Sequence, residues 1–447
     1  SEDRLAYTFQ LREGVLFHDG TLFNALAVGA NLDRITNPNT KSTKALTLLG
    51  TYSSYLVNSE YNITLTLAEP YSPLLDGLSQ VYLGIASPTA LAQYSPERYQ
   101  FHQVGTGPYT LVEFIPDTKL VLRRNPAYQW GPSFYQSADA TMIDEIEYRF
   151  FTDRATRFDG LESGSAQIMG ELPAVTARSL TGSSQFQLIP AAIAGQPLQF
   201  LINTRKAPTD SLAFRQAMLY ATNRAAIADA VYQGFSPVAW GPLTSNTQFY
   251  SAEMNGLYAY DFEAAAQLLA GLGYTDADEN GYLDAADGGD LEVKMIMPPW
   301  SDIPQVAQLM QDQWRTLKLK LTLVPVPDFP TLISTVNSGD YHLVAFNTYG
   351  VDPAFLNAFF VTGGSRNWTG FSDPALDRIL TDAVRLIEPG TRTALYAEAQ
   401  RIIMDNALIL PIRETVNLNA SANTIQGLTY DSYGWFPLML NVRLIDN

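Results

Sequence analysis

The chain of 447 residues is long enough for two or three lobes around sizeable cores. Lys and Arg number 28 against 45 Asp and Glu, and the net charge of −17 disfavours binding to nucleic acid or to anionic lipid surfaces. The sequence has no cysteine, which excludes disulfides, thiolate metal sites and cysteine nucleophiles, and no apolar run approaches the roughly 18 residues of a membrane span.

The first hundred residues carry patterns typical of a small lobe built on antiparallel strands. Residues 7–12 and 61–67 alternate polar and apolar side chains, and Asn24 is a suitable N-cap for a helix between them. The adjacent His18 and Asp19 lie in a turn, where local hydrogen bonding is the usual role. We therefore do not interpret them as a catalytic pair.

A glycine-rich turn followed by two extended runs predicts a β-hairpin near the end of the first quarter of the chain. Gly105 and Gly107 give backbone freedom, and Pro108 fixes φ before residues 109–114 extend. Residues 119–124 form the second run of this hairpin.

The second half of the chain alternates helical and extended patterns. Helices are predicted over 262–270, 301–317 and 329–338, and strands over 291–297 and 320–324. Ser372 is the predicted N-cap of a further helix, whose apolar residues follow helical spacing. A repeated order of strand and helix is typical of an α/β unit.

Residues 276–287 have the spacing of a calcium-binding loop. Alternate oxygen-bearing residues can converge on one ion, and Gly281 permits the sharp bend. The predicted ligands are Asp276, Asp278, Asn280, Tyr282 (through its carbonyl), Asp284 and Asp287. The last is Asp where Glu is usual, and the alternative is a solvated acidic loop. Any calcium would be structural, because nothing nearby offers a nucleophile.

Several strings resemble one family. Gly105-Thr106-Gly107-Pro108-Tyr109, followed by Arg124-Asn125-Pro126, is similar to a signature of the bacterial extracellular solute-binding proteins, family 5, which include dipeptide-, oligopeptide- and nickel-binding proteins of ABC importers. The similarity continues at residues 7–35, 199–227, 339–353, 368–377 and 410–430. It implies an α/β, two-lobed periplasmic-binding-protein fold, class II-like and of cluster C, with an extra small α/β subdomain.

The resemblance also implies a division of the chain. Residues 1–103 form a small accessory lobe, 104–196 with 413–447 form lobe I, and 197–412 form lobe II with the calcium-type loop. A hinge strand is expected near 197–203. In the family a further segment precedes the first motif, and we expect the pocket wall to lack its contribution if that segment is truly missing from the native protein.

By the same resemblance, the protein is not an enzyme but delivers a small ligand, a peptide or another small organic solute, to the permease of an ABC importer by closing two lobes on it. It is expected to be a monomer, periplasmic or extracellular, that meets a membrane only through a lipid anchor outside this sequence.

One departure from the family concerns the ligand. Dipeptide- and oligopeptide-binding members carry an aspartate where this chain has Tyr349, which disfavours a ligand with a free amine unless Asp352 takes over. An uncharged, aromatic-stacked or sugar-like ligand becomes reasonable. The candidate ligand-binding residues are Tyr349, Asp352, Trp300, Trp368, Trp240 and Trp435.

Two alternatives come from other classes. A secreted hydrolase would need a close carboxylate pair in a pocket, whereas Glu145 and Glu147 alternate on a predicted strand edge and are interpreted as solvated. A ligand-sensing domain of a larger regulator is the second alternative.

Overall fold

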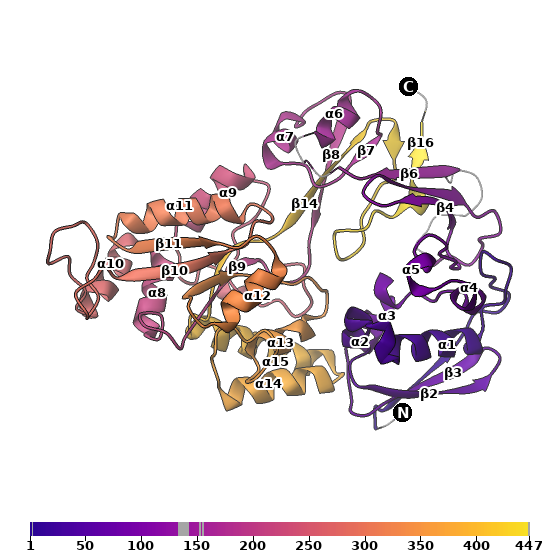
Figure 1. The fold of residues 1–447 in the computed structure, drawn as a ribbon, viewed down its shortest axis with the longest axis horizontal. Coiled ribbons are helices and arrows are strands. Elements are labelled where there is room, and N and C mark those ends of the chain that lie inside the picture. The colour runs from indigo at the N-terminus through magenta and orange to yellow at the C-terminus, as the bar shows by residue number, and fades with distance from the viewer. Residues whose placement is uncertain (2, 133–142, 152, 154–155, 446–447) are drawn as a thin grey trace.

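The computed structural model describes residues 1, 3–132, 143–151, 153 and 156–445 (Figure 1). One body holds a five-stranded sheet with helices on both sides, and the remaining sheets lie across from it. The mixture of helices and sheets in separate bodies is the α/β architecture that the sequence predicts.

The first, second and third lobes named from here on correspond to the predicted accessory lobe, lobe I and lobe II. The first lobe is a three-stranded antiparallel sheet of order β1-β3-β2 covered by helices. Its strands are β1 (Ala6–Gln10), β2 (Tyr52–Ser59) and β3 (Asn62–Leu67). Its helices are α1 (Ala25–Thr36), α2 (Thr43–Leu49), α3 (Leu74–Ser79), α4 (Pro88–Gln93) and α5 (Pro96–Tyr99). Asn24 caps α1 by accepting a hydrogen bond from the backbone N–H of Ala27, as predicted.

The second lobe contains two three-stranded sheets and a short two-stranded one. The predicted hairpin is confirmed as β4 (Tyr109–Ile115) and β5 (Lys119–Arg124), joined by β6 (Glu145–Arg149). The other elements are β7 (Ile168–Met169), β8 (Phe186–Ala192), β14 (Val416–Ala422), β15 (Ile425–Gln426), β16 (Arg443–Leu444), α6 (Arg157–Glu162) and α7 (Ala174–Ser179). β14 lies between β7 and β8, so the C-terminal segment completes a sheet begun by earlier residues.

The third lobe is built on the sheet β11-β10-β12-β9-β13, in which β10 is parallel to β11 and β12 while β9 is antiparallel to both neighbours. Its strands are β9 (Leu198–Ile202), β10 (Glu292–Met297), β11 (Lys320–Pro325), β12 (Leu343–Ala345) and β13 (Ile409–Arg413). Its helices are α8 (Leu212–Ala221), α9 (Arg224–Tyr232), α10 (Phe262–Gly271), α11 (Ile303–Arg315), α12 (Phe329–Asn337), α13 (Leu356–Phe360), α14 (Pro374–Arg385) and α15 (Pro389–Asp405). The predicted α/β repeat of β10, α11, β11 and α12 is therefore confirmed.

Two neighbouring connections join the second and third lobes. One runs from β8 to β9 and the other from β13 to β14, and they touch through the backbone hydrogen bond from Ile193 N to Thr415 O (2.9 Å). A pair of adjacent crossings of this kind can act as a hinge.

Two local expectations differ from the structure. The strand expected to act as a hinge, β9, is a fully buried inner strand of the third lobe's sheet, between β12 and β13. The chain crosses between the lobes just before it. The cap of α14 is Asp373, whose carboxylate accepts from two backbone N–H groups, while the Ser372 hydroxyl instead accepts a hydrogen bond from Thr362 Oγ1. Within the described residues, no helix combines the length and apolarity needed to cross a membrane.

Candidate ligand-binding site

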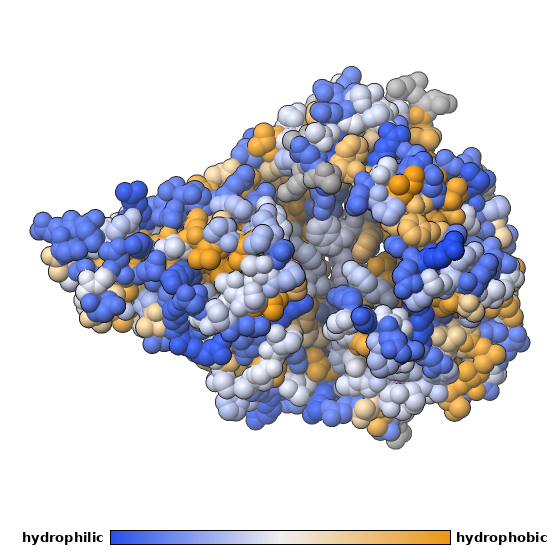
Figure 2. Space-filling view, in the orientation of Figure 1, coloured by the Kyte–Doolittle hydropathy of each residue, from blue (hydrophilic) through white to orange (hydrophobic). Residues whose placement is uncertain are grey.

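A cavity of about 560 Å³ lies where the three lobes meet. The space-filling view shows the molecule hollowed between the third lobe and the other two (Figure 2). The cavity is lined by Lys44, Ser79, Gln80, Val81 and Tyr82 of the first lobe, Thr348 and Tyr349 of the third, and Asp431, Tyr433, Trp435 and Phe436 of the C-terminal segment. The cavity wall is therefore assembled from segments that are far apart in the sequence.

Tyr349 and Trp435 meet at this cavity. Their ring centroids are 5.5 Å apart at 64°, an edge-to-face contact. Tyr349 is 37% exposed, so solvent reaches it at the cavity. The sequence predicted both residues as ligand contacts, and the structure places both on the cavity wall.

The wall around Tyr349 is fastened to the crossing between the second and third lobes. Gln196 N donates to Thr348 O (2.9 Å), and Gly350 N donates to Ala194 O (3.1 Å). Gly195 has φ +134°, and a Cβ there would lie 2.6 Å from both Thr348 O and the Cα of Tyr349. The connection and the cavity wall are therefore packed directly against each other.

The aromatic turn of the C-terminal segment is held by two carboxylates. Asp431 Oδ1 accepts from the backbone N–H of Trp435 and of Phe436, both at 3.2 Å. Tyr433 donates its hydroxyl to both oxygens of Asp76 at 3.0 Å, which ties this turn to the first lobe. Burial raises the pKa of Asp76, and the nearby charge of Asp352 adds to the rise.

Asp352 lies just beyond the cavity wall in a buried ion pair. Its carboxylate receives two hydrogen bonds from one guanidinium nitrogen of Arg392, at 3.0 and 2.8 Å, and both side chains are less than a tenth exposed. The same carboxylate accepts from the backbone N–H of Ala354. Because these donors already engage it, we do not assign Asp352 to the ligand.

The other three predicted tryptophans do not line the cavity. Trp368 is 7% exposed and packs edge-to-face on Phe346. Trp240 is half-buried under the guanidinium of Arg224, which lies 4.4 Å from the ring centroid. Trp300 is half-buried against the core of the third lobe. In this arrangement these rings serve packing.

Several cavity residues were not predicted from the sequence. The aromatic string at Tyr433, Trp435 and Phe436 around Gly434 was a usable signal, because an exposed turn rich in aromatic side chains is unusual. Lys44 and Tyr82 carried no local signal, since each lies in an ordinary surface pattern.

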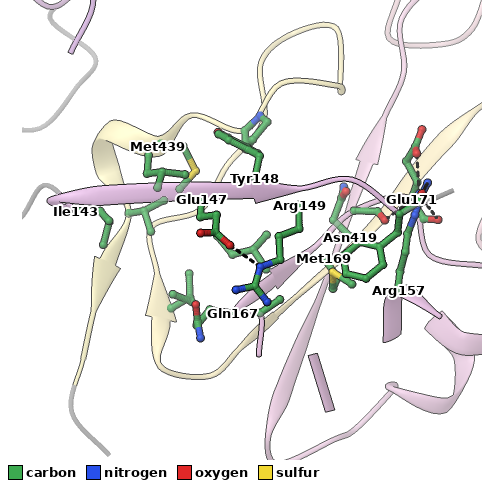
Figure 3. Close-up of a pocket in the computed structure, with 18 of the residues that line it drawn as sticks. Ile143, Glu147, Tyr148, Arg149, Arg157, Gln167, Met169, Glu171, Asn419 and Met439 are labelled. Carbon is green, nitrogen blue, oxygen red and sulfur yellow. Dashed lines mark hydrogen bonds and ion pairs between the residues drawn. The ribbon is translucent and has the colours of Figure 1, made fainter. Parts of the chain in front are cut away.

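A second cavity, of about 660 Å³, lies within the second lobe between β6, β7 and β14 (Figure 3). Glu147 pairs with Arg149, and Arg157 Nη1 lies 2.7 Å from Glu171 Oε2. The side chain of Asn419 is buried, and its Oδ1 has no hydrogen-bond partner among the described residues. Trp435 lines both this cavity and the first one. Because its walls belong to one lobe, lobe closure does not shape it, and the cavity between the lobes is the better candidate site.

The predicted calcium loop is held by its own hydrogen bonds. Asp276 pairs with Lys318 (2.7 Å), Asp278 accepts from the backbone and side-chain nitrogens of Asn280, and Asp284 accepts from Ala277 N. Among the described residues, no three acidic or histidine side chains gather closely enough to hold a metal ion. Calcium binding by this loop stays a prediction.

Comparison with known proteins gives a consistent family. The sequence model described as "Bacterial extracellular solute-binding proteins, family 5 Middle" matches residues 1–369. The glutathione-binding protein GsiB of Salmonella typhi is 28% identical over 442 residues, covering 96% of this chain and 81% of GsiB. GsiB of Shigella flexneri serotype 5b is 27% identical over the same length and coverage.

Solved structures share the fold. NikA from Brucella suis, in complex with Fe(III)-EDTA, superposes with a TM-score of 0.86 at 22% identity and covers 100% of this chain and 89% of its own. A dipeptide-binding protein from Pseudoalteromonas sp. SM9913, in complex with Met-Leu, gives 0.78 at 19% identity with the same coverage. The two-lobed periplasmic-binding-protein fold predicted from the sequence is therefore confirmed.

Proposed function

Because the chain belongs to the bacterial extracellular solute-binding proteins of family 5, we propose that it captures a small organic solute or short peptide in the cavity between its lobes and presents it to the permease of an ABC importer. The observation that carries the proposal is the cavity itself, whose walls come from all three lobes. A ligand that touches each wall binds the closed arrangement better than the open one and so selects it.

The connection at Gly195 gives this closure a mechanical basis. Gly195 lies in one of the two crossings, and its neighbours are hydrogen-bonded to the strand end that carries Tyr349. Rotation about the crossings would therefore carry the Tyr349 ring toward or away from Trp435 and the first lobe. No covalent step is needed, and the proposal includes no catalysis.

The relatives support a peptide-like solute. GsiB is named for glutathione, and the Pseudoalteromonas protein was solved with a dipeptide. In this chain, Tyr349 takes the place at which the peptide-binding members carry an aspartate, and Asp352 is engaged by Arg392. We therefore propose that aromatic contacts, rather than an aspartate at either position, hold the body of the ligand.

We place this function outside the cytoplasm, in the periplasm or at the cell surface, and assign it to a monomer. Family membership supports the extracellular setting. The permease of an importer is the proposed protein partner.

The test is direct binding. Protein purified without refolding is examined by native mass spectrometry for a retained solute, and glutathione and short peptides are then titrated by calorimetry. Tyr349→Ala is expected to weaken binding about tenfold or more, because truncating a central aromatic contact costs about 2 kcal/mol. Tyr260→Ala is the matched control, since Tyr260 is 48% exposed and outside the cavity. Equal affinity of the two variants would contradict the proposed site.

A further inference from the structure

The first and third lobes touch each other at a place outside the cavity. Ser72, between β3 and α3 of the first lobe, donates its backbone N–H to Val384 O at 2.7 Å and its hydroxyl to the same oxygen at 3.0 Å. Glu69 forms an ion pair with Arg385 close by. Val384 and Arg385 are the last residues of α14, which reaches toward the first lobe in Figure 1. We call these four residues the clasp, and none of them lines the cavity.

The end of α14 explains why Ser72 binds there. The last four carbonyls of a helix lack a partner within it. Ala383 O accepts from Arg392 Nε at 2.8 Å, within the third lobe, and lies at 3.5 Å from Ser72 Oγ. Val384 O, in contrast, accepts from two donors of Ser72, in another lobe. The clasp therefore joins a carbonyl that the helix leaves open to donors from across the lobe boundary.

The clasp has to part when the third lobe moves away. The chain enters and leaves the third lobe through the connections from β8 to β9 and from β13 to β14, and both of these lead to the second lobe. The first lobe is fastened to the second lobe instead, because the Tyr433 hydroxyl donates to both oxygens of Asp76 at 3.0 Å. A rotation of the third lobe about its two connections therefore separates α14 from the first lobe.

We infer that the clasp stabilises the closed arrangement whether or not the cavity holds a solute, so that the empty protein also closes part of the time. The clasp consists of protein groups alone, and its net free energy is the same for the empty and the filled cavity. By favouring closure in advance, it raises the apparent affinity for a solute that it does not touch. This inference goes beyond the proposed function, in which the solute selects the closed state.

The strength of the clasp is suited to a reversible closure. The side chains of Arg385 and Glu69 are 46% and 56% exposed, so water screens their attraction. The hydrogen bonds to Val384 O are exchanged for bonds to water when the lobes part, which leaves a small net gain. Contacts of this kind shift an equilibrium by about fivefold. The lobes can therefore reopen.

The experiment measures closure in protein that native mass spectrometry shows to be free of solute. The chain has no cysteine, so Ser53→Cys in the first lobe and Ser334→Cys in the third, both at exposed positions, place one fluorophore on each lobe. Single-molecule energy transfer then gives the ratio of closed to open molecules. Glu69→Arg is the test variant, because it sets a like charge against Arg385. Glu60→Arg is the matched control, since it makes the same charge change at an exposed site of the same lobe.

Glu69→Arg is expected to lower the closed-to-open ratio about fivefold relative to the control. Adding Arg385→Glu restores opposite charges in reversed order and should return the ratio toward that of the wild type, a rescue that a merely misfolded variant would not show. Ser72→Ala should lower the ratio as well, because it removes one of the two donors to Val384 O.

Three results would overturn the inference: a wild type with no closed population in the absence of solute, equal ratios for Glu69→Arg and Glu60→Arg, or a charge-swapped pair that stays as open as Glu69→Arg. The measurement uses no solute, so each of these results leaves the proposed function standing. A failure of every titrated solute to bind would count against the proposed function and leave the clasp in place.

Discussion

The buried pair of Asp352 and Arg392 beside the cavity allows a sharp test of how the third lobe is held together. Arg392 Nε also donates to Ala383 O (2.8 Å), and its guanidinium lies 4.6 Å from the centroid of the Phe249 ring. The change is Arg392→Met, which keeps most of the apolar stem but removes every one of these charged contacts. Asp352 would then be a buried carboxylate without its counter-ion.

The magnitude follows from burial. The two side chains are 7% and 4% exposed, so water cannot replace the lost partner. Removing one member of such a pair typically costs about 3–5 kcal/mol, because the remaining charge stays desolvated. Arg401, on the same helix α15, is the matched control: it is 47% exposed and pairs with Glu398 and Asp405 at the surface. Arg401→Met is expected to cost about 1 kcal/mol or less.

Urea unfolding at pH 7, followed by tryptophan fluorescence, measures both variants, and the shift in midpoint of the first cooperative transition is compared with wild type. The double variant Arg392→Met with Asp352→Ala should recover part of the loss, since it removes the stranded charge. If Arg392→Met is as stable as Arg401→Met, or if the double variant is no more stable than Arg392→Met, the reasoning is refuted.

Three further outcomes are expected. Gly195→Ala should destabilise the protein by about 1–3 kcal/mol and weaken solute binding, because the new Cβ would overlap backbone atoms 2.6 Å away. Gly271→Ala is the control and should have neither effect, because the space around Gly271 is open. Thermal melting measures the stability of both variants, and calorimetry measures their solute binding. Asp340 pairs with Lys206 and with Lys294 (2.9 Å), and these two lysines lower its pKa from 3.8 to about 2. Asp340→Asn should therefore be less stable than wild type at neutral pH. In melting curves, the difference from wild type should vanish as the pH falls from 3.8 through about 2. Calcium should raise the melting temperature of the wild type, and Asp278→Asn should abolish the rise, if the loop at 276–287 closes on the ion.

Each of these has a clear contrary result. Equal melting of the two glycine variants would mean that the backbone approach at the crossing is not tight. A difference between Asp340→Asn and wild type that persists unchanged at pH 2 would show that the ion pairs are not its source. A melting temperature that does not change on addition of calcium would contradict calcium binding by this loop.

Much of the secondary structure was predictable because its causes are local. The hairpin of β4 and β5 follows from Gly105, Pro108 and the alternation on either side, and these act within a few residues. The order of β10, α11, β11 and α12 likewise follows from apolar periodicity within each element. Where the local signal was shared by neighbours, as at Ser372 and Asp373, the prediction chose the wrong cap, since either side chain can accept a backbone N–H.

The candidate site was only partly predictable. Tyr349 and Trp435 were predicted and lie on the cavity wall, but Asp352 is committed to Arg392, a partner on a later helix that no local pattern reveals. Lys44 was missed for the same reason, because a lone cation in sequence gives no sign of what faces it.

The sequence by itself therefore determined the family, the alternation of helices and strands, and the absence of cysteine chemistry. The tertiary structure decided which side chains meet. Packing places β9 between β12 and β13, and it returns the C-terminal segment to the second lobe as β14. As a result, Trp435 contacts Tyr349, and the aromatic turn lies beside the first lobe. Contacts of this kind depend on the order of strands in a sheet and on the crossing of lobes, which are fixed by burial of the whole core rather than by neighbours in sequence.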